Sequence, residues 1–422
     1  MKSPSASLLA AVTCALLSPT APARAETPAP CTVGLYGTPP HEFVIITQSE
    51  DGFDYSFQDG RGGAVGAPNG QVTCAGAAVQ TSDNAFWPRV DLQETDVVFS
   101  SAGTELAGRL IEPPGASAST PLAVIAHGSE ATGWLDRADH PYQLVARGVS
   151  IFVYDKRGTG RSGGTYNQNF PRLAADLTAA STEAKRLAEG RFGRFGLFGL
   201  SQGGWVAPLA AGPSAAEFIG IGYGLVADIR EEDATQVELD LRRAGHGDAV
   251  IAQAREITEA TARYVTTLSD DALAAFLGVR DRFRGAPWLA DISGDYTGIL
   301  LNATEDDIRT KISPVFRSYD VDWSLDPVDI VRRAAVPQLW AFAGADRAAP
   351  PEQSIARLKT LRAEGAELLL YVFPQTDHGM WQFTETTDGT RTYTRRTPAF
   401  YDMMADWAFG ALAERYGSAE AL

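Results

Sequence analysis

The chain has 422 residues, of which 45% are hydrophobic, so it can bury an ordinary globular core and has room for one large domain and a smaller module. Its 36 lysines and arginines are outnumbered by 52 aspartates and glutamates, which gives a formal net charge of -16 without a long block of one sign. This balance argues against nucleic acid and anionic membrane surfaces as partners.

Residues 1–25 have the pattern of an export signal peptide. Lys2 supplies the positive end, residues 8–17 form a short apolar core, and residues 23–25 provide the small residues of a cleavage site. That core is too short to span a bilayer of about 30 Å, and no later segment approaches the roughly 20 apolar residues that spanning needs. We therefore expect an exported protein, periplasmic or secreted, that loses Cys14 with its signal.

Residues 26–94 are expected to form a small β-rich module. The stretch is rich in glycine and turn pairs, and it contains two strand candidates, residues 43–47 and 53–57. Its two cysteines, Cys31 and Cys74, are an even number in an exported protein, which favours a disulfide over two unpaired buried thiols. The module has no evident catalytic cluster, so we expect it to support or partly cover a neighbouring site.

From residue 95 to residue 422, strand candidates alternate with helical segments, which predicts a mostly parallel α/β sheet. Eight strand candidates occur, at residues 96–100, 106–112, 122–126, 150–154, 194–198, 217–221, 338–343 and 367–373. Helices are expected at residues 172–189, 249–267, 271–284, 352–364 and 399–415. The connection between the sixth and seventh strands is so long that it predicts a helical cap at about residues 225–326.

A nucleophile elbow is predicted at residues 199–203, which read Gly-Leu-Ser-Gln-Gly. They follow an apolar strand candidate and lead into a stretch of small residues, 204–211, which is the strand, turn and helix context that an elbow requires. Glycines on both sides of Ser201 allow the sharp turn that pushes the strained serine outward. This pattern predicts a serine hydrolase.

A second segment, residues 160–164, fits the same five-residue pattern around Ser162. The residues that follow it lead to Pro171 and cannot readily open a helix, so Ser201 is the favoured nucleophile. Residues 158–163 also match a dinucleotide-binding fingerprint, but that fingerprint should open a helix directly. A structural turn is the favoured interpretation.

A serine nucleophile needs a base and a carboxylate that orients the base, and both follow in the chain. Asp346 lies just after the seventh strand candidate and His378 just after the eighth, where open α/β sheets place their sites. Asp346 is favoured over Asp228, which follows the sixth strand. Asp377 is expected to cap its loop, because neighbouring residues rarely aim their side chains together.

Two backbone N–H groups are expected to bind the oxyanion of the tetrahedral intermediate. One belongs to Gln202, directly after the nucleophile, and the other to Ser129, in the turn that follows the third strand. His127 in the same turn is expected to be structural.

Together these motifs resemble the α/β-hydrolase superfamily, and among its members secreted bacterial carboxylesterases and prolyl-oligopeptidase-like hydrolases. The resemblance extends from about residue 96 to the C-terminus and rests on residues 127–129, residues 155–162, the Ser201 elbow and the loops of Asp346 and His378. It implies a mostly parallel eight-stranded sheet flanked by helices, with a helical cap insertion. In similar esterases the His-Gly-Ser turn often continues with glycine, where this chain has Glu130.

The expected activity is hydrolysis of small-molecule carboxylic esters through an acyl-enzyme. Hydrolysis of short peptides or amides is the alternative, which a cap carboxylate such as Glu231 or Glu232 would favour by binding an amino terminus. A catalytically silent binding module is less favoured, because the nucleophile, base and acid are all present. No zinc spacing, phosphate-binding loop or paired-cysteine motif occurs, so no metal or cofactor is expected. The cap residues Trp288 and Trp323 are expected in the core, with pocket lining as the alternative.

Overall fold

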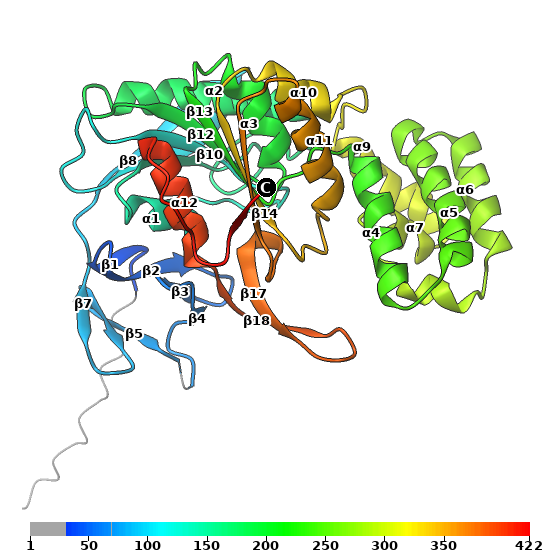
Figure 1. Cartoon of the computed structure of the whole chain (residues 1–422), viewed down its shortest axis with the longest axis horizontal. Coiled ribbons are helices and arrows are strands. Elements are labelled where there is room, and N and C mark those ends of the chain that lie inside the picture. Colours follow the sequence, from blue (N-terminus) through cyan, green and yellow to red (C-terminus); the bar gives the residue numbers. More distant parts are fainter. Residues whose placement is uncertain (1–30, 69) are drawn as a thin grey trace, which may run out of the picture.

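The computed structural model describes residues 31–68 and 70–422 (Figure 1). The predicted signal peptide, residues 1–25, lies outside the described residues. Within the described part of the chain, no helix is both long and apolar enough to cross a membrane.

A nine-stranded sheet forms the centre of the molecule, in the order β19-β15-β14-β13-β12-β10-β11-β9-β8. Its strands are β8 (Gln93–Ser101), β9 (Thr104–Glu112), β10 (Leu122–Ala126), β11 (Ser150–Tyr154), β12 (Phe195–Leu200), β13 (Phe218–Gly222), β14 (Gln338–Ala343), β15 (Leu368–Phe373) and β19 (Glu420–Ala421). Neighbours from β11 to β15 run parallel, whereas β8, β9 and β19 pair antiparallel. The predicted, mostly parallel α/β sheet is confirmed, and β19 adds a ninth strand at one edge.

Helices cover both faces of this sheet, which is why its central strands are continuous apolar runs. Along β10, Leu122 and Val124 pack in the core cluster that contains α2 (Phe170–Leu187) and α3 (Gly203–Ala211). The alternate residue Ala123 packs in the opposite cluster, with α1 (His140–Val145) and α12 (Pro398–Phe409). Two further helices, α10 (Pro327–Arg333) and α11 (Glu352–Ala363), flank the α3 side.

Residues 34–88 form two small antiparallel sheets ahead of the central one. The first contains β1 (Gly34–Thr38), β2 (Glu42–Gln48), β3 (Phe53–Phe57) and β4 (Gly62–Ala64), and the second contains β5 (Val72–Ala75), β6 (Ala78–Thr81) and β7 (Phe86–Pro88). A disulfide joins Cys31 to Cys74, with 5.3 Å between their Cα atoms. The β2 residue Phe43 packs in the same core cluster as α1 and α12, so this module is anchored on that face of the sheet (Figure 1).

Helices that follow β13 and precede α10 build a cap with its own core. They are α4 (Ile229–Arg243), α5 (Asp248–Thr267), α6 (Asp270–Arg282), α7 (Thr297–Leu301), α8 (Glu305–Asp307) and α9 (Ser313–Ser318), with short helical segments at Pro287–Asp291 and Ile308–Ile312. Val237, Leu241, Tyr264 and Phe276 are almost completely buried among them. Figure 1 shows the cap on the side of the molecule away from the small N-terminal sheets.

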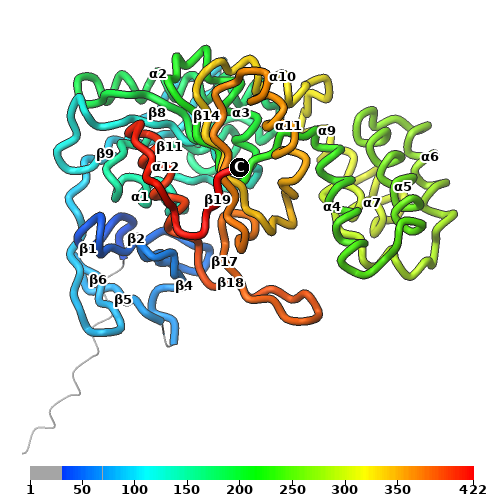
Figure 2. Tube along the Cα trace, in the orientation of Figure 1, coloured from blue at the N-terminus to red at the C-terminus, as the bar shows by residue number. Residues whose placement is uncertain are grey.

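The end of the chain differs from the sequence prediction. The helix expected at residues 399–415 stops at Phe409, because Gly410 adopts a left-handed φ of 76° that ends it. The tail then returns to the sheet and pairs β19 with β15 (Figure 2).

A hairpin that the sequence did not reveal lies ahead of α12, where β17 (Trp381–Glu385) pairs with β18 (Arg391–Arg396) and with β16 (Thr376–Asp377). Its strands are half-buried or exposed, and the apolar alternation is limited to Trp381 and Phe383 of β17, which is too short for strand prediction.

Candidate active site

Ser201 lies in the tight turn between β12 and α3. Its φ of 52° is in the left-handed region, which is uncommon for a residue with a side chain. A Cβ at Gly199 would lie 2.3 Å from the carbonyl oxygen of Gly203, and a Cβ at Gly203 would lie 2.5 Å from the carbonyl oxygen of Ala126. Both positions therefore require glycine, because strand and helix approach each other too closely for any side chain.

The structure brings Ser201, His378 and Asp346 together at the carboxyl ends of β12, β15 and β14. His378 Nε2 lies 3.1 Å from Ser201 Oγ, and His378 Nδ1 lies 2.8 Å from Asp346 Oδ2. The other oxygen of Asp346 accepts hydrogen bonds from the N–H groups of Ala348 at 3.0 Å and Ala349 at 2.7 Å. The carboxylate is thus fixed by the backbone and oriented toward the imidazole.

The pKa of His378 reflects two opposing influences. Burial lowers the pKa, but the hydrogen bond and the negative charge of Asp346 outweigh burial, and Asp377 and Asp295 add to their effect. The pKa of His378 therefore lies above its ordinary value. An imidazole in this setting is a stronger base than one in water, and its protonated form is stabilised by Asp346.

Asp377 fixes the loop that carries His378. Its carboxylate accepts from the N–H of His378 at 2.9 Å and from the hydroxyl of Tyr393 at 2.7 Å, and it forms an ion pair with Arg391 at 2.5 Å. Both partners lie on β18, so the hairpin holds the histidine loop from outside. Sequence reasoning missed this support, although the Asp-Gly pair at residues 388–389 is a hairpin signal.

The turn of residues 127–129 lies beside the nucleophile, because a Cβ at Gly128 would be 3.4 Å from Ser201 Cβ. Lys156 Nζ donates to the carbonyl oxygen of Gly128 at 2.5 Å, and the hydroxyl of Tyr166 donates to the carbonyl oxygen of Ser129. Since C=O and N–H point in opposite directions across a trans peptide, Lys156 directs the N–H of Ser129 away from itself. Among the described residues, neither this N–H nor that of Gln202 has a hydrogen-bond acceptor.

Glu130, at the position where similar esterases often have glycine, ties the turn together. Its carboxylate lies 2.7 Å from His127 Nδ1, and His127 stacks on Trp134 with 4.6 Å between ring centroids. Burial raises the pKa of Glu130, but the contact with His127 and the charge of Lys156 outweigh it and lower the pKa to about 2. Burial lowers the pKa of His127. Because its ring contacts Glu130 and stacks on Trp134, this imidazole has a structural role in the turn.

Comparison with known proteins identifies the family. The model of the alpha/beta hydrolase family matches residues 123–390. The chain belongs to this family. No curated protein matches the sequence of this hydrolase.

Several solved structures are similar to it. An esterase of Pyrococcus furiosus is 13% identical, with 68% of this chain and 84% of that chain covered and a TM-score of 0.42. An acylaminoacyl peptidase of Pyrococcus horikoshii is 14% identical, with 89% of this chain and 55% of that chain covered and a TM-score of 0.46. Est1E of Butyrivibrio proteoclasticus, with ferulic acid bound, is 18% identical, with coverage of 67% and 90% and a TM-score of 0.40.

A cavity of about 220 Å³ in the hydrolase includes Ser201 in its lining. It is shaped by large apolar side chains from both the sheet domain and the cap: Phe170, Trp205, Ile229, Tyr296, Ile299, Phe316 and Tyr319. Its polar lining consists of Ser129, Gln168, Ser201, Gln202, Glu232 and Asp295. Neither Trp288 nor Trp323 belongs to this lining, so the aromatic walls come from positions that the sequence did not single out.

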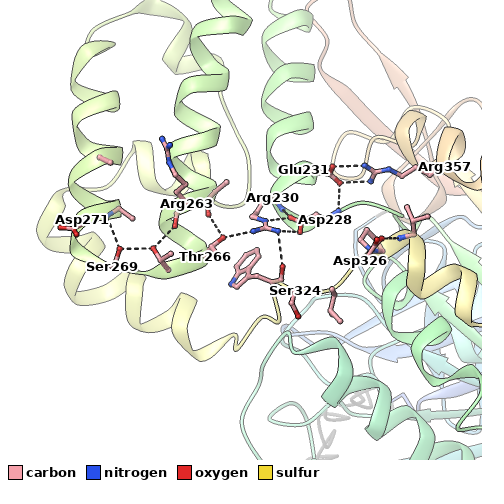
Figure 3. A pocket seen from close by; sticks show the side chains of 18 of the residues that line it. Asp228, Arg230, Glu231, Arg263, Thr266, Ser269, Asp271, Ser324, Asp326 and Arg357 are labelled. Carbon is pink, nitrogen blue, oxygen red and sulfur yellow. Dashed lines mark hydrogen bonds and ion pairs between the residues drawn. The ribbon is translucent and has the colours of Figure 1, made fainter.

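A larger cavity of the hydrolase lies elsewhere, at the base of the cap (Figure 3). It measures about 1430 Å³ and shares no lining residue with the cavity of Ser201. Its charged side chains largely satisfy one another, since Arg230 pairs with Asp228 and Arg357 pairs with Glu231. Asp228, the alternative acid, also caps α4 and is not hydrogen-bonded to His378.

Ser162, the alternative nucleophile, is part of a structural turn. Its Oγ donates to the carbonyl oxygen of Asp155 at 2.6 Å and accepts from the N–H of Ala107 at 2.9 Å. The hydroxyl thereby links two backbone segments. The glycines around it lead into an extended loop, and α2 begins only at Phe170, which agrees with a turn and not with a dinucleotide fingerprint.

Proposed function

We propose that this hydrolase cleaves small-molecule carboxylic esters through an acyl-enzyme formed on Ser201. The observation that carries the proposal is the hydrogen-bonded series from Ser201 Oγ through His378 to Asp346, located beside a cavity lined by both aromatic and polar side chains. A serine hydroxyl is a weak nucleophile until a base removes its proton, and His378 lies within reach of that proton.

In the first half-reaction, His378 Nε2 takes the hydroxyl proton while Ser201 Oγ forms a bond to the ester carbonyl carbon. The bond between that carbon and the alcohol oxygen then breaks, and His378 returns the proton to the departing alcohol. In the second half-reaction, His378 takes a proton from water and the water oxygen bonds to the acyl carbon. The acyl bond to Oγ breaks, and the proton returns to Ser201.

Charge that develops on the carbonyl oxygen needs donors already in place. The N–H groups of Ser129 and Gln202 serve this role in the proposal, and their lack of acceptors among the described residues supports it. Asp346 keeps the imidazole in the tautomer that accepts at Nε2 and stabilises its protonated form.

Hydrolysis of amides or short peptides is the second candidate, because one observation favours it. Of the two cap carboxylates that sequence reasoning considered, Glu231 pairs with Arg357, whereas Glu232 lines the cavity of Ser201.

The disulfide between Cys31 and Cys74 supports export to an oxidising compartment, periplasmic or extracellular.

A fluorophosphonate probe and a series of aryl esters test the proposal. We expect a covalent adduct on Ser201 and loss of about a thousandfold or more of ester turnover in Ser201→Ala. The matched variant Ser162→Ala should keep its adduct and most of its turnover if it folds. Full turnover in Ser201→Ala would overturn the assignment of Ser201 as the nucleophile, and the absence of an adduct on the folded protein would favour a silent binding module.

A further inference from the structure

Three consecutive acidic residues at the start of α4 have different environments. Glu231 forms two hydrogen bonds of 2.9 Å with Arg357. Asp233 accepts from the N–H groups of Tyr296 at 2.8 Å and Thr297 at 3.0 Å, and so fixes the start of α7 against α4. Glu232, between them, is directed to the cavity that contains Ser201.

Two carboxylates thus line this cavity without a partner in the chain. Glu232 is partly buried and Asp295 is exposed, and neither side-chain carboxylate forms a hydrogen bond or ion pair with any residue in the ranges 31–68 and 70–422. No lysine or arginine is among the residues that line the cavity. Burial raises the pKa of Glu232 well above its ordinary value, and the charges of Asp295, Asp346 and Asp233 raise it further.

A separate observation in the same cavity also indicates a missing donor. Gln202 is only 3% exposed, it belongs to the cavity lining, and its Oε1 is a buried acceptor without a hydrogen-bond partner. Buried polar atoms in native proteins are nearly always paired, so this oxygen points to a ligand or water that donates to it.

The surroundings suit a cation. A nearby ammonium group would favour the ionised form of Glu232 and so offset its raised pKa, and aromatic side chains such as Trp205, Tyr296 and Phe316 also attract an ammonium group. The volume of about 220 Å³ is below the range of drug-sized pockets, which limits the acyl group to a small one.

We propose that Glu232 and Asp295 form a subsite for the ammonium group of an aminoacyl substrate, whose carbonyl is attacked by Ser201. This inference rests on the proposed function and narrows it to acyl donors with a free amine next to the scissile carbonyl. A neutral acyl group of the same shape leaves the partly buried Glu232 without a cationic partner, so it binds less well in both ground and transition states.

The test compares alanine benzyl ester with isobutyric acid benzyl ester, which differ only by ammonium in place of methyl. At pH 7 we expect kcat/KM to favour the alanine ester by about 10- to 100-fold, since hydrogen bonds to charged groups have this strength. Glu232→Gln should reduce this preference about tenfold or more, and Asp295→Asn should reduce it less because Asp295 is exposed. The control Glu231→Gln, which removes an acid engaged with Arg357, should retain the preference.

Equal kcat/KM for the two esters, or the same loss of preference in Glu231→Gln, overturns the subsite while leaving the esterase proposal intact. Absence of hydrolysis of both esters overturns the proposed function instead. Calorimetry on the Ser201→Ala variant then decides the subsite independently: tighter binding of the alanine ester, lost in the Glu232→Gln double variant, supports it, and equal binding of both esters refutes it.

Discussion

Substitution of Lys156 by methionine should separate stability from activity. Lys156 is 3% exposed, and its ammonium group donates to the carbonyl oxygen of Gly128 beside the nucleophile. Burial lowers the pKa of this lysine from 10.5 to about 8, and the negative charge of Glu130 opposes that shift only in part. At pH 7 the buried Lys156 is therefore charged although burial disfavours its charged form. This ammonium group holds the turn that contains Ser129.

The magnitude follows from that pKa. A decrease from 10.5 to about 8 corresponds to about 3 kcal/mol of unfavourable free energy at pH 7, which Lys156→Met removes. The variant also leaves the carbonyl oxygen of Gly128 without its donor, a loss of about 1 to 3 kcal/mol. At pH 7 the variant should thus be between equal in stability to the natural protein and about 2 kcal/mol more stable.

The sign of this difference should change with pH. Between about pH 8 and 10.5 the unfolded chain holds a proton on Lys156 that the folded chain has released, so raising the pH stabilises the natural protein relative to the variant. Above this window only the lost hydrogen bond remains, and the variant becomes the less stable protein. Urea unfolding at pH 7 and above about pH 10.5 measures both values.

Activity should fall in Lys156→Met even where stability rises. Loss of one oxyanion donor typically lowers kcat by about a hundredfold or more, and a turn without its anchor should lose about 10- to 100-fold. Lys185→Met is the matched control, since Lys185 also donates to a backbone carbonyl, that of Ser214 at 2.8 Å, but far from the nucleophile. An unchanged kcat in Lys156→Met, or a stability difference that is the same at both pH values, would refute the reasoning.

Three further outcomes follow from the structure. Because the pKa of His378 is raised, kcat/KM should fall as the pH drops through a value above about 6.5. Asp346→Asn should move this fall in kcat/KM to lower pH and lower the rate by about 10⁴, and a fall that stays at the same pH excludes His378 as the base. Cys31 and Cys74 are 43 residues apart, so their disulfide restricts a long loop of the unfolded chain, and replacing both by serine should lower the free energy of unfolding by about 4 kcal/mol in urea titrations. A change below about 1 kcal/mol would contradict this loss of chain entropy as the source of stability. Gly199→Ala should lower the melting temperature by several degrees or prevent folding, because its Cβ would lie 2.3 Å from a backbone oxygen that cannot move; an unaltered melting curve would disprove this steric argument.

Local sequence patterns were sufficient to predict the α/β architecture. The predicted α/β sheet is confirmed because buried parallel strands are short apolar runs that can be recognised without knowing their neighbours. The elbow at Ser201 was also readable, since a strand, a glycine-flanked serine and a helix are adjacent in the chain. Order along the chain then indicated Asp346 and His378, which the structure places within hydrogen-bond distance of each other, although their catalytic role stays a proposal.

Other features depended on segments that meet only in three dimensions. The hairpin that holds Asp377 and the edge strand β19 were missed, because their polar residues form strands through pairing partners and not through apolar alternation.

The sequence by itself determined the fold class and the candidate nucleophile, base and acid, because these are encoded in periodicity and in chain order. Only the tertiary structure decided which of two adjacent acids, Glu231 or Glu232, lines the cavity of Ser201, since Arg357 engages the first and leaves the second without a partner. It likewise decided that Lys156 is buried with a lowered pKa, because desolvation depends on everything packed around a side chain. Substrate preference is expected to arise from these nonlocal contacts.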